Sequence, residues 1–424
     1  MRIIHIETAK HILYTALMLS GMALSFGKWI VFSKVLPPTD FGLYTAVMSS
    51  VAVSAYIGAM GLSEYLIQRG SSSHGQGQIV EIYELRDNSI FVGLLITTLL
   101  LVPACMASFI MDWWGLGLAN FTILCAILVS TVLFGIVDAS LRAAQRALAF
   151  ASMVFLRAVL LLFSGYILAS WGNFSGILVA ELASSTAAIL VALYVWGPIL
   201  RLKKISLNIT TFEILIKNGF SFLKLQLLRY TSLMLDKWFV GWSLGSLALG
   251  QYSFLLITFL AFTAFAGVYN AVIIPRLIST FNKNNNHSSL AKITRLQALG
   301  FLTGSLLLAP LYLSTLNEII SRFFSEYVFP DLLFSLTLIF LGSAFHVASQ
   351  FFDSFFYATH KQAELTMISA LSLILFFACY LAAGNLMEPS VMGFSLAFFL
   401  CKLFWFLMTY FRVSQINRVS AATF

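Results

Sequence analysis

Charged residues inside an apolar stretch are the first feature of this sequence that could do chemistry. Residues 222–238 read FLKLQLLRYTSLMLDKW and carry Lys224, Arg229, Asp236 and Lys237 among long apolar side chains. A Lys or Arg at the centre of a membrane-spanning helix costs about 2.5–3.5 kcal/mol on insertion scales. Such a cation therefore needs a route to the membrane surface, a structural partner or an anionic ligand.

Five cations in apolar runs are candidates for binding an anion, and their surroundings differ. Lys224 lies towards one end of its run and has the alternative of reaching the membrane surface, as Lys237 does from the other end. A cation–π contact is the alternative for Lys402, which lies among aromatic residues. The five candidates are Arg229, Lys28, Arg157, Lys224 and Lys402.

Arg229 is the most telling of these cations, because it lies near the middle of its apolar run. At about 100° per residue, a continuous helix places Ser221, Gln226, Ser232 and Asp236 within one arc around it. This stripe predicts a helix face turned towards water or a polar ligand. A structural ion pair between Arg229 and Asp236 is the alternative.

Acidic residues are fewer in the apolar runs, and most lie close to the run ends. Asp138 has Arg142 at position i+4, which predicts an ion pair near the membrane surface. Glu181 and Asp236 lie deeper. Embedded cations outnumber embedded acids, which favours an anionic ligand over a cationic one. The candidates for ion coupling or charge pairing are Asp236, Glu64, Asp138 and Asp353.

Composition fixes the class of protein that must position these charges. The chain is 60% hydrophobic and 10% charged, whereas a soluble domain is about a quarter charged. We therefore expect an all-α integral membrane protein. The sequence shows no metal cluster, nucleotide loop or catalytic triad, so we expect neither an enzyme nor a metal site. His346 and the cysteines are interpreted as residues of the packed core.

About twelve apolar stretches are long enough to span a bilayer. Lys and Arg concentrate on one side of them, in 69–88, 201–216 and 276–293, which predicts cytoplasmic termini and explains the net charge of +8 without nucleic acid. The first stretch reads as a retained helix. The expected spans are 11–34, 41–68, 89–111, 118–140, 148–171, 175–198, 217–242, 249–275, 294–316, 330–357, 364–385 and 389–411.

Two pairs of similar segments indicate an internal repeat. KWIVFSKVLPPTDFGLY (28–44) matches KWFVGWSLGSLALGQY (237–252), and DASLRAAQR (138–146) matches DSFFYATHK (353–361). The offset corresponds to six spans, so both copies cross the membrane in the same direction, related by a pseudo-two-fold axis along the membrane normal. The repeat predicts an N-terminal six-helix lobe, a cytoplasmic linker and a C-terminal six-helix lobe, at 1–200, 201–216 and 217–424.

The segments LPPTDFGLYTAVMSSVAVSAYIGAMGLSEYLIQRG and LDKWFVGWSLGSLALGQYSFLLITFLAFTAFAGVYNAVIIPRLI resemble signatures of a transporter family. This is the polysaccharide-export branch of the multidrug/oligosaccharidyl-lipid/polysaccharide exporter superfamily, and the chain is most similar to Wzx-type O-antigen flippases. The resemblance implies a V-shaped pair of six-helix bundles around a cationic cavity.

The resemblance also implies a function in lipopolysaccharide biosynthesis. An undecaprenyl-pyrophosphate-linked oligosaccharide, such as an O-antigen unit, would move by alternating access from the cytoplasmic to the periplasmic leaflet of the bacterial inner membrane. Coupling to H+ or Na+ is implied, with no cofactor, and other membrane proteins of polysaccharide assembly are implied as partners.

Two other functions remain open from the sequence. A multidrug or cation antiporter of the same superfamily would need acids in its core to hold a cation, and here the embedded cations outnumber them. A membrane polysaccharide polymerase or ligase would resemble this chain in its span count. Those enzymes carry a sizeable periplasmic loop, whereas the outer connections expected here are all short.

Overall fold

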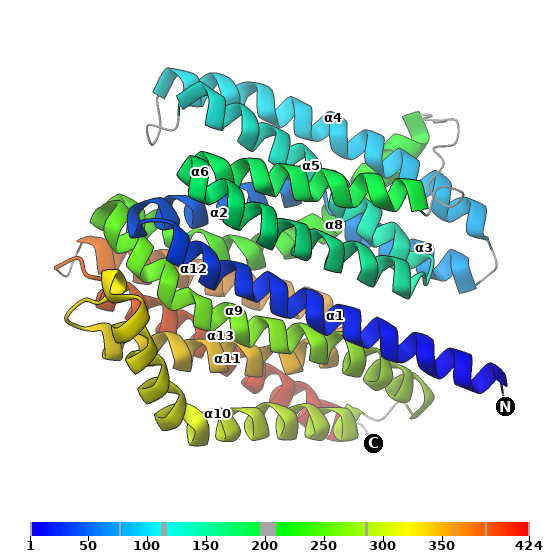
Figure 1. Ribbon diagram of the computed structural model, residues 1–424. Helices are drawn as coiled ribbons and strands as arrows, with labels where there is room; N and C mark the ends of the chain where they lie inside the picture. Colours follow the sequence, from blue (N-terminus) through cyan, green and yellow to red (C-terminus); the bar gives the residue numbers. More distant parts are fainter. Residues whose placement is uncertain are drawn as a thin grey trace. The chain divides into compact units, whose positions relative to one another are not determined.

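The computed structural model of the protein describes residues 2–75, 78–111, 117–195, 209–284, 287–359, 361–385 and 388–422. These residues form helices joined by short connections, and they include no β-strand (Figure 1). Contacts divide the chain into two compact units. Unit 1 is Met1–Leu36 with Val47–Leu227, and unit 2 is Pro37–Ala46 with Leu228–Phe424.

The boundary between the units falls inside two helices, α2 and α8. It lies between Ala46 and Val47 in α2 and between Leu227 and Leu228 in α8. The division of the chain into two lobes of six helices each stays a prediction. The helices up to this second boundary are α1 (Arg2–Val35), α2 (Pro38–Gly58), α3 (Leu62–Gly75), α4 (Ile79–Met111), α5 (Gly117–Ala143), α6 (Ala147–Val195) and α8 (Ile209–Met234).

Unit 1 is organised around α5 and α6. α6 packs against α1 and α5, and α5 also packs against α3 and α4. α6 is a helical hairpin and not one long rod, because Asn173 adopts a left-handed conformation with φ 49° in its middle. A Cβ added at Gly176 would lie 1.9 Å from the carbonyl oxygen of Leu168. The two legs of α6 therefore meet closely at the turn, and they run back along each other from there.

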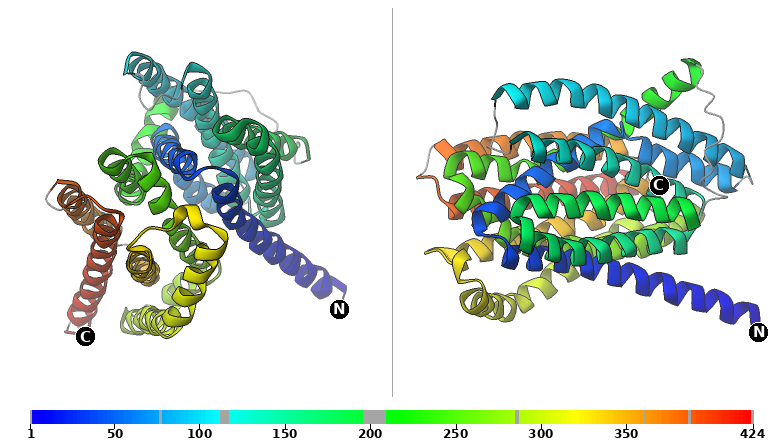
Figure 2. Two further views of the ribbon diagram at one scale, coloured as in Figure 1. Left: turned by 60° about the vertical axis from the view of Figure 1, so that its left-hand side comes forward. Right: turned by 45° about the horizontal axis from the view of Figure 1, so that its top comes forward.

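Unit 2 is organised around α11. α11 packs against α9, α10 and α13, and α12 packs against α13. α10 is bent in every view (Figures 1 and 2), and Pro310 lies within it, where a backbone donor is missing. The elements are α9 (Asp236–Asn284), α10 (His287–Phe323), the short 3-10 helix η2 (Ser325–Tyr327), α11 (Leu332–Ala358), α12 (Gln362–Asn385) and α13 (Val391–Ala422).

The expectation of an all-α multi-pass membrane protein is confirmed. Within the described residues, nine helical stretches are long and apolar enough to cross a membrane. Two of them, Ala147–Tyr194 and Thr211–Ala264, each cover two of the predicted spans. The predicted span 89–111 lies in α4. All twelve predicted spans therefore fall on helices where the structure describes them.

Two predicted spans contain a break that hydropathy does not reveal. The span 41–68 is divided into α2 and α3, because Met60 and Gly61 have φ values of 50° and 67°. The span 217–242 is divided at Leu235, between the end of α8 and the start of α9. The residues at both breaks are apolar or small. The hydropathy of each segment is therefore the same as that of one continuous membrane-spanning helix.

The polar segments 69–88 and 276–293, which connect predicted spans, are largely helical. In the segment 69–88, α3 continues to Gly75 and α4 begins at Ile79; in 276–293, α9 continues to Asn284 and α10 begins at His287. Polar residues extend these helices beyond the apolar runs. Arg86, in the polar segment 69–88, is 1% exposed within α4, with Nη2 2.6 Å from Asp87 Oδ1.

Candidate functional site

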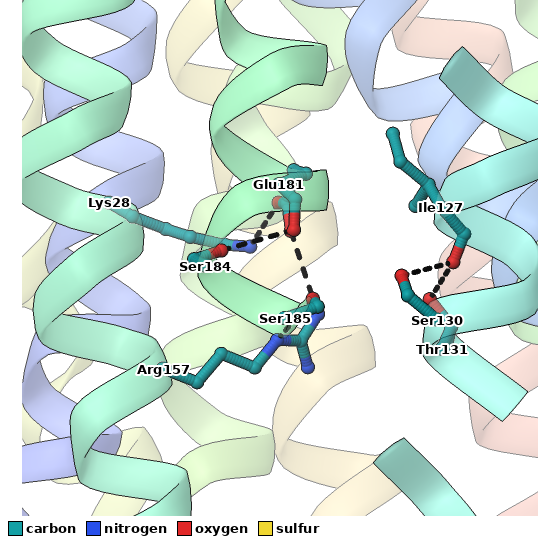
Figure 3. Close-up of polar contacts among 8 residues, drawn as sticks. All are labelled: Lys28, Ile127, Ser130, Thr131, Arg157, Glu181, Ser184 and Ser185. Carbon is teal, nitrogen blue, oxygen red and sulfur yellow. Dashed lines mark hydrogen bonds and ion pairs between the residues drawn. The ribbon is translucent and has the colours of Figure 1, made fainter. Parts of the chain in front are cut away.

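In unit 1, two of the predicted cations converge on one buried acid. Lys28 on α1 places Nζ 2.9 Å from Oε1 of Glu181, which lies on the second leg of α6. Arg157, on the first leg, places Nη2 3.5 Å from Oε2 of the same carboxylate. Figure 3 shows both side chains directed towards Glu181 from different helices. We call Lys28, Arg157 and Glu181 the unit 1 charge cluster.

The hairpin of α6 is what brings this cluster together. Arg157 and Ser185 lie at comparable distances from the turn at Asn173, and Arg157 Nε donates a hydrogen bond of 3.0 Å to Ser185 Oγ. Ser185 is one helical turn beyond Glu181, so both side chains share a helix face. The centroid of the Phe134 ring lies 4.7 Å from the Arg157 guanidinium carbon.

The unit 1 charge cluster carries two positive charges against one negative charge. Glu181 is fully buried, whereas the side chains of Lys28 and Arg157 are 14% and 26% exposed. The acid is thus more deeply buried than either cation. With its three groups ionised, the cluster has a net charge of +1. A charge in the protein interior attracts an anion more strongly than the same charge in water, because the effective dielectric constant is lower.

In unit 2, Arg229 is paired, but not with the expected acid. Its Nη2 lies 2.5 Å from Oδ2 of Asp353 on α11, and its guanidinium carbon is 5.9 Å from the ring of Trp405. The direct acidic partner of Arg229 is thus Asp353, whereas the alternative from the sequence named Asp236. Asp236 is the first residue of α9, and its carboxylate is engaged by Lys237 and Tyr252.

Lys402 is buried in unit 2 between aromatic rings. It is 3% exposed, and its Nζ lies 5.3 Å from the ring of Phe398 and 5.8 Å from that of Phe259. These distances are those of a cation–π contact, which was the alternative interpretation of Lys402 from the sequence. No hydrogen bond or ion pair joins Lys402 to another described residue.

His346 on α11 also contacts the Phe259 ring, with the ring centroids 5.1 Å apart. One of its ring nitrogens lies 3.0 Å from the Gln350 amide nitrogen. The interpretation of His346 as a hydrogen-bonded residue of the packed core is confirmed.

Asp236 belongs to a separate buried network. Its carboxylate lies 3.2 Å from Nζ of Lys237 and accepts a hydrogen bond of 3.2 Å from the Tyr252 hydroxyl. The Tyr252 and Tyr380 hydroxyls are 2.9 Å apart. Lys237 therefore has an acidic partner, although its place near a span end had suggested contact with the membrane surface.

The other predicted residues lie apart from these clusters. Lys224 is exposed, with its Nζ 4.7 Å from the ring of Phe220. Asp138 forms the predicted ion pair with Arg142, at 2.5 Å. Glu64, partly buried on α3, makes no ion pair with a described residue.

Glu181 was recognised in the sequence as a deep acid, but it was not among the predicted site residues. The signal was present: it is an acid deep in an apolar run, with serines at i+3 and i+4. Its partners could not be found from the sequence, since they come from two other helical segments. Among the described residues, no group of three His, Cys, Asp or Glu side chains is arranged to hold a metal ion.

Comparisons with known proteins agree with this architecture. The sequence pattern of a family described as polysaccharide biosynthesis protein matches residues 31–316. The structure is similar to the lipid II flippase MurJ in an inward closed conformation, with a TM-score of 0.73 and 14% identity, covering 95% of this chain and 87% of that chain. No curated protein matches the sequence.

Two transporters of the MOP superfamily are also similar. A multidrug resistance MATE family transporter in an inward-facing conformation has a TM-score of 0.69 and 13% identity, covering 97% of this chain and 99% of that chain. A transporter from Pyrococcus furiosus, described as having a binding pocket of reverse polarity, has a TM-score of 0.60 and 14% identity, covering 96% and 95%. The chain has the fold of these transporters, and it belongs to the polysaccharide biosynthesis protein family.

Proposed function

We propose that the protein is a flippase for a lipid-linked oligosaccharide whose headgroup carries phosphate. In the form that the family resemblance implies, the substrate is an undecaprenyl-pyrophosphate-linked glycan, such as an O-antigen unit. It moves from the cytoplasmic to the periplasmic leaflet of the bacterial inner membrane, with both protein termini in the cytoplasm. The protein binds its substrate through charge and holds no cofactor.

The unit 1 charge cluster carries this proposal. Lys28 and Arg157 both lie within apolar helices, and one acid serves both of them. Embedding the second cation raises the free energy of the protein, unless an anion joins it during the working cycle. A pyrophosphate supplies such an anion, because its oxygens accept charge-assisted hydrogen bonds from guanidinium and ammonium groups.

Unit 2 supplies further positive charge. Lys402 is buried without a hydrogen bond to a described residue, and Arg229 pairs with Asp353. Asp353 and Asp236 are both engaged by cations or hydroxyl groups. In the proposed function, Asp353 and Asp236 neutralise part of the positive charge of the neighbouring cations. A coupling ion would act on the same two carboxylates.

A multidrug or cation antiporter is the second candidate, favoured by the similarity to MATE transporters, which is nearly as high as that to MurJ. The two functions require ligands of opposite charge. A cation substrate needs an acid that is available to it, whereas Glu181 and Asp353 are each paired with cations. The balance of buried charge therefore favours the anionic substrate.

Deletion of the gene tests the proposal in cells. The flippase function predicts loss of surface polysaccharide and accumulation of lipid-linked oligosaccharide in the inner leaflet, both reversed by the parent gene. Unchanged surface polysaccharide together with greater sensitivity to cationic drugs would contradict it and support the antiporter.

A further inference from the structure

Glu181 has a position that a purely structural acid does not need. Its two carboxylate oxygens point to different cations, Oε1 to Lys28 and Oε2 to Arg157. A phosphate group would present its oxygens to the same two cations in a similar way. Glu181 thus occupies the place of an anionic ligand from inside the protein.

The strengths of the two contacts are unequal. Lys28 is held at 2.9 Å, whereas the Arg157 contact is 3.5 Å and the guanidinium has Ser185 as a second partner at 3.0 Å. Arg157 is also the more exposed of the two cations. An arriving anion would therefore bind Arg157 first, while Lys28 still holds the carboxylate.

A carrier that alternates between two faces must also return without substrate. Lys28 and Arg157 would then be left in apolar surroundings with no anion, at a cost of several kcal/mol for each buried ion. A carboxylate that pairs with them in the empty state lowers this cost. When a substrate phosphate arrives, the same carboxylate competes with it, which keeps binding loose enough for release.

We propose that Glu181 is an internal counter-anion, which neutralises Lys28 and Arg157 in the empty carrier and yields them to the substrate phosphate. The inference rests on the proposed function, because it presumes that these two cations bind the anionic headgroup. It predicts that Glu181 weakens substrate binding while it speeds repeated transport. A structural acid would do neither.

Binding measurements on the full-length protein in lipid nanodiscs test this role. The probe is farnesyl pyrophosphate, a short polyprenyl pyrophosphate, with inorganic pyrophosphate as the comparison. Glu181→Gln removes the competing charge and keeps the shape of the side chain, so we expect its Kd to fall about tenfold or more. Glu181→Asp retains the charge and should keep a Kd within a few-fold of the parent.

Two further variants complete the design. Glu318→Gln neutralises one partner of an exposed ion pair with Arg322 on α10 and should leave the Kd unchanged. The double variant Glu181→Gln with Lys28→Met has the parent's net cluster charge of +1, so it should lose the gain in affinity. Melting temperatures of all variants report whether each remains folded.

The outcomes separate the two proposals. If the parent does not bind farnesyl pyrophosphate, the proposed function fails. If the parent binds it and a folded Glu181→Gln variant binds no more tightly, Glu181 is structural and this inference fails. If inorganic pyrophosphate binds as tightly as farnesyl pyrophosphate, the site recognises free phosphate, and the link to a lipid substrate is overturned.

Transport supplies the second readout. In reconstituted vesicles, Glu181→Gln should bind more tightly and yet flip fewer molecules per protein over many cycles, because the empty carrier returns slowly. Tighter binding with faster repeated transport would overturn the role in the return step.

Discussion

Gly42 and Gly250, which occupy matching positions in the two Gly-x-Tyr segments, lie directly against each other in unit 2. A Cβ added at Gly42 would be 2.5 Å from the backbone nitrogen of Gly250. Three residues further along each segment, Thr45 Oγ1 and Ser253 Oγ are hydrogen-bonded at 2.6 Å. Where two copies are related by a two-fold axis, a residue meets its own counterpart only at that axis. The contact therefore supports the predicted repeat.

This close crossing of α2 and α9 predicts a strong effect of a single methyl group. A Cβ at Gly250 would lie 1.9 Å from the carbonyl oxygen of Pro38, so Gly250→Ala forces the backbones apart. We expect destabilisation of about 1–3 kcal/mol or more, measured as a lower melting temperature in detergent. Gly300→Ala is the control, because no atom lies within 4 Å of its added Cβ. A Gly250→Ala protein that melts like the parent would contradict the tight crossing.

The Arg229–Asp353 pair predicts that charge removal has two separable effects. Arg229→Gln leaves a buried carboxylate without its partner, which should destabilise the protein by about 3–5 kcal/mol. The double variant Arg229→Gln with Asp353→Asn should recover most of that stability, yet still export poorly. Arg229→Lys should retain partial transport, because a point cation still pairs with phosphate.

Two measurements check this prediction: the melting temperature of each variant, and surface polysaccharide in a flippase-deficient strain at equal membrane expression. Full export by the stable double variant would show that Arg229 serves the structure alone.

Replacing Lys402 should raise the stability of the protein and weaken its binding of the substrate. It is a buried cation with aromatic neighbours and no hydrogen bond to a described residue. Lys402→Met removes the cost of burying the charge while it keeps a similar volume, so the melting temperature should rise. Binding of farnesyl pyrophosphate should weaken at the same time. A variant that is more stable and binds as well as the parent would assign Lys402 to packing alone.

The topology can be tested at connections between the helices. Reporter fusions after Gly75 and after Asn284 should give cytoplasmic signals, because Lys and Arg concentrate on that side. Fusions at Leu36, between α1 and α2, and at Pro330, before α11, should give periplasmic signals. The opposite pattern at either pair of positions would reverse the proposed direction of transport.

The sequence predicts the helices well, because a membrane imposes a minimum apolar length on each span. It predicts their breaks and partners less well. The helical spacing offered Asp236 as the alternative partner of Arg229 and could not name Asp353, because Asp353 lies on α11, 124 residues further along the chain. For Glu181, the sequence predicts a position deep in an apolar run. It does not predict the contacts with Lys28 and Arg157, because these depend on how separate helices pack.

Flipping by the reconstituted protein shows whether Lys28 and Arg157 move the substrate. Undecaprenyl-pyrophosphate-linked oligosaccharide is placed in vesicles with the parent or with the Lys28→Met, Arg157→Gln double variant, and the fraction reached by an added glycosidase is followed over time. We expect the parent to make both leaflets accessible, whereas the double variant, with equal amounts of folded protein, leaves the inner-leaflet pool protected. Equal flipping by the parent and the double variant would show that the cations of unit 1 have no part in moving the substrate.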